Sequence, residues 1–329
     1  MMPETCENRL ALAHYRFHLT PLEPLEMPAG NKGGTIRGGF GAAFRRLVCI
    51  DLNLDCAVCD LRYTCPYTRV FNPFVPPAAE RLSKNQNLPR PFIVKPPLEW
   101  TTTYRPGEPL VFDFIAVGEA MDYLPYFIVA FRELGAGGFG LNRARCELSS
   151  IAALSSAGEV TAVYDGKEGV VRPPRDNLTW PALIARSAIL NSRHEITIRF
   201  LTPTTLKMDG EAVTVPQFHA LIKRLRDRIN ALSYFYCGGA LDIDFKELGE
   251  QAEKVKEVAV RSQWIDRGRR TRKGFAQDLS GFVGEVTYRG ELAPFLPLLL
   301  LGEYVHVGKN AAFGNGWYRL EGPNGGKEW

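Results

Sequence analysis

The sequence predicts an α+β protein in which one β-α-β-β-α-β unit occurs twice in tandem. Three observations predict this fold class. An alternating strand that ends in Leu-Thr-Pro occurs twice, an amphipathic helix follows each copy, and a glycine-rich loop closes each copy. The 329 residues, at ~150 residues per domain, provide for about two such domains.

The first copy begins with a strand in residues 14–27 (HYRFHLTPLEPLEM), where large side chains alternate as they do on a sheet with one buried face. A strand at residues 110–117, an apolar helix at 124–131 and a glycine-rich stretch at 135–148 complete this copy. A further helix is predicted between the strands at 14–27 and 110–117. Its apolar residues share one face at a period of 3.6: Ile36, Phe40, Ala43, Phe44, Leu47 and Val48.

The second copy begins 180 residues later, in residues 194–208 (HEITIRFLTPTTLKM). A strand at 282–288, an apolar helix at 292–301 and a glycine-rich segment at 302–320 complete it. Its amphipathic helix, which Pro216 is well placed to open, has one apolar face: Phe218, Leu221, Ile222, Leu225, Ile229 and Leu232. The β-α-β-β-α-β unit is the ferredoxin-like motif, in which two helices cover one face of the sheet.

This pattern divides the chain into two units and a connection. Residues 1–150 form the N-terminal unit, with a proline- and cysteine-bearing insertion at about 49–100. Residues 151–190 contain glycines and a Pro-Pro pair and are predicted to form a hairpin and linker. Residues 191–329 form the C-terminal unit.

Composition excludes several classes of protein. With 45% hydrophobic and 23% charged residues, the chain is typical of a folded globular protein. Its longest nearly apolar run, residues 292–301, is interrupted by two prolines and is shorter than the ~18–20 residues that a membrane helix needs. The N-terminal segment lacks the apolar core of a secretory signal, and the seven cysteines are an odd number. We therefore expect a cytoplasmic protein with no disulfide framework and no membrane partner.

The net charge of +4 is too small to indicate a nucleic-acid partner, but the distribution of charge is uneven. The run Arg267–Lys273 (RGRRTRK) carries five basic residues in seven between two predicted strands. Phosphate neutralisation by such clusters is the main source of affinity for nucleic acid. We therefore predict that the basic residues of this run contact RNA: Arg267, Arg269, Arg270, Arg272 and Lys273. The alternative is that the run is a solvated loop.

The insertion contains Cys49, Cys56, Cys59 and Cys65, with six, two and five residues between neighbours. The central Cys-x-x-Cys is a recurrent part of structural zinc sites, and four thiolates complete a tetrahedral ligand set. The sequence therefore predicts a structural zinc site. An iron–sulfur cluster takes the same ligands, and unligated buried cysteines are the remaining alternative.

Several segments resemble one known family. Residues 302–320, with Val-Gly-Lys and Phe-Gly-Asn-Gly-Trp, are similar to the C-terminal signature of the CRISPR-associated repeat-RNA-processing endoribonucleases of the RAMP superfamily. Residues 280–290 (SGFVGEVTYRG) and 65–73 (CPYTRVFNP) resemble further parts of that family. The resemblance implies an enzyme that cleaves CRISPR precursor RNA within its repeats without a metal. Attack by a 2′-hydroxyl leaves a 2′,3′-cyclic phosphate and a 5′-hydroxyl.

That chemistry needs a base, an acid and a cation beside the phosphate. His306 is the leading acid or base, Lys309 the predicted phosphate-stabilising cation, and Tyr304 an assisting residue, because an extended chain would place Tyr304 and His306 on the same side. The alternative for His306 is a packed, hydrogen-bonded residue between two valines. Many members of the family have a catalytic histidine at the first helix, but residues 30–49 contain none. Lys32 is the candidate there, with a solvated lysine as the alternative.

Further arginines in the glycine-rich stretch and the two helices are predicted RNA contacts: Arg37, Arg143, Arg145, Arg224 and Arg228. The resemblance implies repeat RNA, as precursor and as mature guide, as the partner, lying along a basic surface between the two units, with other CRISPR effector subunits as further partners. Two other functions stay open. One is a non-catalytic RAMP subunit that binds guide RNA in an interference complex, and the other is a duplicated ferredoxin-like protein that binds a small ligand.

Overall fold

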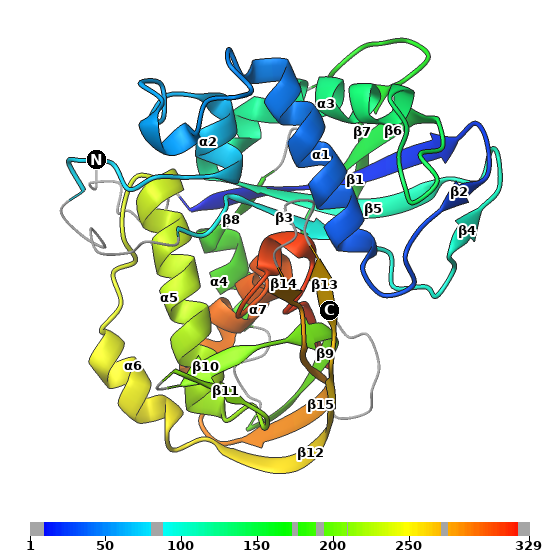
Figure 1. Ribbon diagram of the computed structural model, residues 1–329. Coiled ribbons are helices and arrows are strands. Elements are labelled where there is room, and N and C mark those ends of the chain that lie inside the picture. The colour runs from blue at the N-terminus through cyan, green and yellow to red at the C-terminus, as the bar shows by residue number, and fades with distance from the viewer. Residues whose placement is uncertain are drawn as a thin grey trace. The chain divides into compact units, whose positions relative to one another are not determined.

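The computed structural model describes residues 10–79, 88–172, 177–188, 194–208, 210–270 and 276–321 (Figure 1). The chain divides into two compact units. The unit that we call N-terminal comprises Leu10–Leu178 together with Phe235–Gly238. The C-terminal unit comprises residues 179–234 and the chain from Gly239 onward.

The sheet of the N-terminal unit is antiparallel, in the order β3-β5-β1-β6-β7. Its strands are β1 (Ala11–Pro21), β3 (Phe92–Lys95), β5 (Leu110–Val117), β6 (Cys146–Leu154) and β7 (Val160–Asp165). The first and third strands of the repeat, β1 and β5, therefore lie side by side at its centre. Short elements lie between the main strands and helices of this unit: β2 (Leu25–Glu26), η2 (Cys56–Val58), α2 (Pro66–Phe71), β4 (Thr103–Tyr104) and η3 (Gly118–Tyr123).

Two helices, α1 (Lys32–Val48) and α3 (Leu124–Ala136), cover one face of this sheet (Figure 1). Alternating phenylalanines of the strands meet the apolar faces of the helices. The Phe40 ring stacks on Phe131 at 4.6 Å between centroids, and Phe131 lies 4.9 Å from Phe17. Burial of these large rings supplies much of the hydrophobic stabilisation of the unit.

The C-terminal unit repeats the same order of strands as β12-β15-β9-β16, again antiparallel. These are β9 (Glu195–Thr204), β12 (Lys256–Ile265), β15 (Gly281–Arg289) and β16 (Tyr318–Glu321). The other elements are β8 (Leu178–Thr179) at the division between units, α4 (Trp180–Ala188), the hairpins β10 (Leu206–Met208) with β11 (Glu211–Val213) and β13 (Gly268–Arg270) with β14 (Ala276–Asp278), α5 (Phe218–Tyr236), α6 (Phe245–Ala252), η4 (Ala293–Phe295), α7 (Leu296–Val305) and η5 (Ala311–Phe313).

The two matching sheets confirm the predicted tandem ferredoxin-like fold. The six predicted apolar residues of α5 are all buried, so its period was interpreted correctly. Two details differ from the sequence prediction. The second strand of the N-terminal unit, β3, lies inside residues 49–100, which were predicted to be only an insertion, because a strand of four buried residues has no alternation to detect. Leu47, predicted on the apolar face of α1, is 41% exposed.

The predicted linker at residues 151–190 also contains more structure than a connection. It holds the end of β6, β7 as an added strand of the N-terminal sheet, β8 and α4. The division between the units falls after Leu178. Within the part of the chain that the structure describes, no helix has the length and apolar character that crossing a membrane requires.

Candidate functional site

The glycine-rich segment of the C-terminal unit folds into a tight loop, residues 306–317, which we call the C-terminal glycine loop. It begins where α7 ends, with His306 at φ +60°, and it continues through Gly308 at φ +79° and Gly316 at φ +73°. A Cβ atom on Gly316 would lie 1.8 Å from the Val307 carbonyl oxygen. Glycine is therefore required at position 316 by both conformation and space.

The second Leu-Thr-Pro motif holds this loop. The Thr202 hydroxyl donates to the Gly314 carbonyl at 2.7 Å and accepts from the Trp317 backbone N–H at 2.9 Å. The Gly316 N–H donates to the Pro203 carbonyl at 3.1 Å. The second Leu-Thr-Pro motif, which marks the repeat in the sequence, thus stabilises the loop through hydrogen bonds.

His306 lies in the interior of the C-terminal glycine loop and has 0% exposure. Its Nδ1 lies 3.1 Å from the Asn315 carbonyl oxygen, and its ring stacks on Trp317 with 5.8 Å between centroids. The structure therefore gives His306 the packed, hydrogen-bonded position of the alternative interpretation. Its catalytic role stays a prediction.

Tyr304 does not share an extended segment with His306, so the predicted alternation is wrong. Helix α7 continues through Val305, and Tyr304 belongs to its last turn. Burial raises the pKa of the Tyr304 phenol, and the nearby Arg186 of α4 opposes that rise. Tyr304 therefore keeps its proton at neutral pH, and its phenol oxygen accepts a hydrogen bond from Arg186.

Lys309 is exposed at the rim of the same loop, and its backbone N–H donates to the Thr205 carbonyl. Partial burial and the nearby Lys207 of β10 lower the pKa of the Lys309 amine, while Asp278 opposes this effect. The structure thus brings together two amines from segments far apart in the sequence, which we call the lysine pair. Sequence reasoning missed Lys207, although it follows the Leu-Thr-Pro motif by only four residues.

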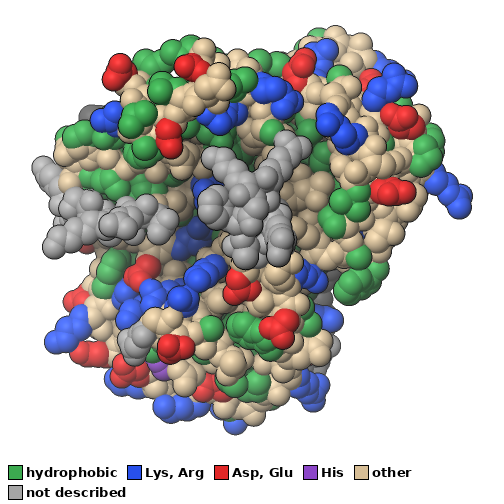
Figure 2. Space-filling model, viewed as in Figure 1, with side chains coloured by type: hydrophobic (Ala, Val, Ile, Leu, Met, Phe, Trp, Pro, Cys, Tyr) green, Lys and Arg blue, Asp and Glu red, His purple; other side chains and the backbone are tan. Residues whose placement is uncertain are grey.

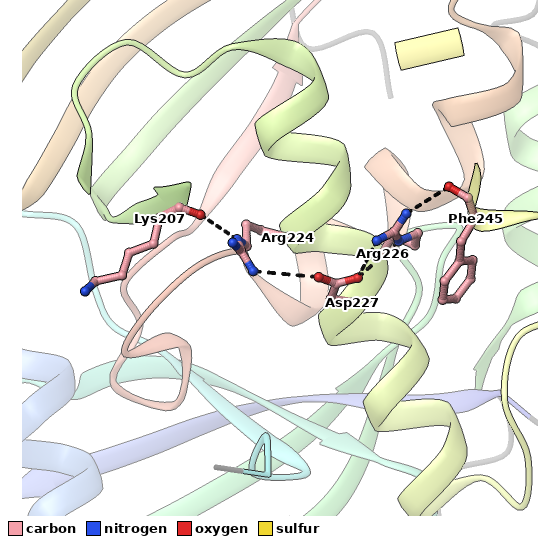
Figure 3. A network of polar contacts seen from close by, with 5 residues as sticks. All are labelled: Lys207, Arg224, Arg226, Asp227 and Phe245. Carbon is pink, nitrogen blue, oxygen red and sulfur yellow. Dashed lines mark hydrogen bonds and ion pairs between the residues drawn. The ribbon is translucent and has the colours of Figure 1, made fainter. Parts of the chain in front are cut away.

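The basic face of α5 supports the backbone around the lysine pair (Figure 3). Arg224 donates through Nε to the Lys207 carbonyl at 2.6 Å and pairs with Asp227 at 3.7 Å. Arg226 binds Asp227 and the Phe245 carbonyl, and Arg228 donates to the Val305 carbonyl at 2.8 Å. Lys and Arg side chains gather over α5 (Figure 2). The predicted RNA-contact residues Arg224 and Arg228 therefore each brace a backbone carbonyl next to the loop.

The arginine run begins on the β13–β14 hairpin. Burial lowers the pKa of the half-buried Arg267, whose backbone N–H donates to the Ser280 hydroxyl. Arg269 and Arg270 belong to β13, but their side chains are outside the described part of the structure. Arg272 and Lys273 lie entirely outside the described residues. Their RNA contacts stay a prediction.

A second polar cluster occupies the N-terminal unit at the start of α1. Lys32 is only 4% exposed, so its interpretation as a solvated loop residue is wrong. Its Nζ donates to the Glu99 carbonyl at 2.6 Å and lies 3.2 Å from the Glu99 carboxylate. The Tyr104 hydroxyl donates to the same carboxylate at 2.5 Å, and the Tyr104 ring lies 5.4 Å from Nζ.

Burial alone would raise the pKa of the Glu99 carboxyl, but the hydrogen bonds from Tyr104 and Lys32 hold it below its usual value. Burial and the hydrogen bond to Glu99 raise the pKa of Tyr104. Sequence reasoning missed both partners, because neither lies within 60 residues of Lys32 in the chain.

The remaining predicted contacts of the N-terminal unit lie apart from this cluster. The Arg37 guanidinium lies 5.5 Å from the Phe71 ring. Arg143 is exposed, with φ +58°, and donates to the Gly137 carbonyl at 3.4 Å. Arg145 forms a salt bridge with Glu23 at 3.4 Å, which compensates part of its charge.

The four cysteines of the insertion are half-buried and free. Burial raises the pKa of the Cys56 thiol, and the nearby Cys49 and Cys65 raise it further. Across the residues that the structure describes, no three or more His, Cys, Asp or Glu side chains form a group that could hold a metal. The predicted zinc site is therefore not supported, because the loop does not place four thiolates in a tetrahedral set.

Two family models match the chain. Residues 10–176 match AF_1859_N, described as an N-terminal domain. Residues 198–318, which include β9, α5, the lysine pair and the C-terminal glycine loop, match CRISPR_Cas6, described as the CRISPR-associated endoribonuclease Cas6. A protein of Archaeoglobus fulgidus described as uncharacterized is 29% identical over 317 residues, which cover 93% of each chain.

Solved structures of Cas6 proteins have the same fold. Cas6 of Thermus thermophilus matches with a TM-score of 0.54 and 15% identity, covering 94% of this chain and 98% of that one. A Cas6 product complex gives a TM-score of 0.52 at 18% identity, with 94% and 99% coverage. A partial Cas6-RT-Cas1–Cas2 complex gives 0.58 at 16% identity, covering 95% of this chain and 46% of that one. The AF_1859_N match spans half of the chain, so the chain belongs to the AF_1859_N family, and residues 198–318 of its C-terminal unit are similar to the Cas6 endoribonuclease family.

Proposed function

We propose that this protein is a metal-independent endoribonuclease that cleaves CRISPR precursor RNA within its repeats. The 2′-oxygen of one nucleotide attacks the adjacent phosphorus and the P–O5′ bond breaks. The 2′-hydroxyl gives its proton to a base, and an acid protonates the leaving 5′-oxygen. The products carry a 2′,3′-cyclic phosphate and a 5′-hydroxyl. The match of residues 198–318 to the Cas6 endoribonuclease family carries the proposal.

The lysine pair favours binding of a phosphate at the C-terminal glycine loop. Two neighbouring amines create a positive potential, and a phosphorane with its added charge gains more from it than the ground-state phosphate does. Lys309 is therefore assigned the stabilising role.

The other sequence-predicted residues have assisting roles in this proposal. Tyr304 is a protonated phenol on the helix that precedes the loop. Lys32 offers a cation in the N-terminal unit, held by Glu99. His306 remains the proposed acid or base. Because its ring is buried, it can act only if the C-terminal glycine loop lets the substrate reach it.

Recognition of the repeat is proposed to depend on phosphate contacts and a few unpaired bases, because A-form stems offer shape more than readable base edges. The contacts proposed are the arginines of the β13–β14 hairpin, α1, α5 and the first glycine-rich stretch. One structural relative is a complex of Cas6 with RT, Cas1 and Cas2. Other CRISPR proteins, effector subunits among them, are proposed as partners of this chain.

The test uses a labelled repeat RNA and the purified protein in EDTA, resolved on a denaturing gel. We expect cleavage, with a cyclic phosphate on the upstream fragment. Lys309→Ala should lower the cleavage rate by ~100-fold, as for loss of one transition-state charge stabiliser. Lys223→Ala, which removes an exposed lysine of α5, is the matched control and should cut at the wild-type rate.

One observation favours the second function, a non-catalytic RNA-binding subunit. His306 is fully buried, and residues 30–49 contain no histidine. The same gel separates the two functions. Tight binding with intact RNA supports the subunit, whereas RNA cut in EDTA supports the enzyme.

A further inference from the structure

Trp100 lies on the surface of the N-terminal unit and is 78% exposed. The other tryptophans with described side chains are more enclosed; Trp180 and Trp317, for example, are 5% and 6% exposed. A large aromatic ring that remains in water does not contribute its burial free energy to folding. Its position therefore needs an explanation other than packing within the chain.

The backbone on both sides of Trp100 is fixed. The carbonyl of Glu99 accepts the hydrogen bond from Lys32 at 2.6 Å, and the carbonyl of Thr102 accepts from the Met27 N–H at 2.7 Å. The Tyr104 hydroxyl also binds the Glu99 side chain. The exposed indole is thus carried by a short, anchored segment, so a ligand that stacks on it pays little ordering cost.

The residues that follow Trp100 are mostly polar, and Leu98 and Glu99 precede it. Thr101, Thr102 and Thr103 follow it and are all exposed, and Arg105 is exposed beyond them. An apolar protein interface has a continuous hydrophobic core with a polar rim. A single exposed ring that is followed by exposed threonines and an exposed arginine fits an unpaired nucleotide better, because a base can stack on the ring while hydroxyl and guanidinium groups contact sugar and phosphate.

We propose that Trp100 stacks on an unpaired base of the repeat RNA in the nucleotides bound near Lys32. This inference rests on the proposed function and adds a specific contact to it. In this proposal Trp100 positions the RNA in the N-terminal unit, whereas the C-terminal glycine loop belongs to the C-terminal unit.

The experiment measures binding of a repeat RNA that has a 2′-deoxy substitution at the cleavage site, so that binding and cutting are separated. Trp100→Ala should weaken binding about tenfold, within the range for one base–aromatic stack. Trp100→Phe keeps a ring and should bind within about threefold of wild type. Leu98→Ala removes a neighbouring exposed apolar side chain without a ring and is the matched control.

A fluorescence measurement on the unaltered fold complements these variants. Addition of the RNA should protect the exposed indole from acrylamide quenching in the wild-type protein, and that protection should be absent in Trp100→Phe. If the wild type binds the repeat while Trp100→Ala binds equally well and no protection is seen, the inference is overturned and the proposed function is unaffected. If the wild type neither binds nor cuts the repeat, both fail.

Discussion

The two glycine-rich loops descend from the same sequence pattern but are built differently. In the C-terminal unit, the Thr202 hydroxyl bridges two backbone groups of the loop. In the N-terminal unit, the equivalent Thr20 hydroxyl donates to Ser149 on the neighbouring strand, so the first motif braces the sheet. The same three residues support a loop in one copy and a strand pair in the other.

The charges beside the two loops also differ. Arg145, in the first glycine-rich stretch, is paired with Glu23, whereas Lys309 lies beside a second amine, that of Lys207. Asp278 also lies near Lys309, but two amines beside one carboxylate leave a net positive charge, which attracts phosphate more strongly than a one-to-one ion pair does. A duplicated loop therefore becomes a candidate phosphate site through its neighbours rather than through its glycines.

The largest effect expected is on the stability of the C-terminal loop. Gly316→Ala should cost at least ~3 kcal/mol, because the new Cβ would overlap the Val307 carbonyl and φ is +73°. Gly158→Ala also has a positive φ but meets open space, so it should cost about 1 kcal/mol. Thermal unfolding followed by circular dichroism measures both. Equal losses in the two variants would contradict the tight packing of the loop.

His306→Ala tests whether the buried ring of this loop takes part in the reaction. We expect cleavage to fall by at least ~100-fold, as for loss of a general acid or base, with little change in RNA affinity. Rates are compared at a temperature where circular dichroism shows the variant to be folded. Wild-type cleavage by the folded variant would assign the acid–base role to another residue.

The two Leu-Thr-Pro motifs can be compared directly with one substitution in each. Thr202→Val leaves the Trp317 N–H and the Gly314 carbonyl without their buried partner and should cost ~2 kcal/mol. Thr20→Val removes a half-buried contact between hydroxyls and should cost less than ~1 kcal/mol. The free energy of unfolding in urea distinguishes them, and a larger loss for Thr20→Val would reverse the assignment of the brace.

The smallest effect concerns the cluster around Lys32 and depends on pH. The folded-state pKa of Glu99 is lowered, so its stabilising contribution is complete above the unfolded pKa of about 4.3 and is lost as pH falls through the folded value. Glu99→Gln keeps the shape of the side chain and removes its charge. The difference in Tm between wild type and variant should therefore be largest near pH 7 and shrink below about pH 4. A difference that stays constant down to pH 3 would show that the carboxylate charge contributes nothing.

Predictions from the sequence succeeded where the signal was local and repeated. The period of α5 placed Phe218, Leu225 and Leu232 in the core, because one helix face is buried whatever lies against it. Prediction failed at Tyr304 and His306, where an alternating pattern was assumed and the chain is still helical through Val305. Short stretches of apolar residues do not distinguish a helix end from a strand.

By itself, the sequence determined that this protein has two ferredoxin-like units with matching helices and glycine-rich loops, because hydrophobic period and glycine conformation are properties of neighbouring residues. Only the tertiary structure decided which polar groups meet. Lys32 meets Glu99, and Lys309 meets Lys207, across long separations in the chain. The strength of a charge depends on burial and on its neighbours in space, and the order of residues along the chain does not specify either.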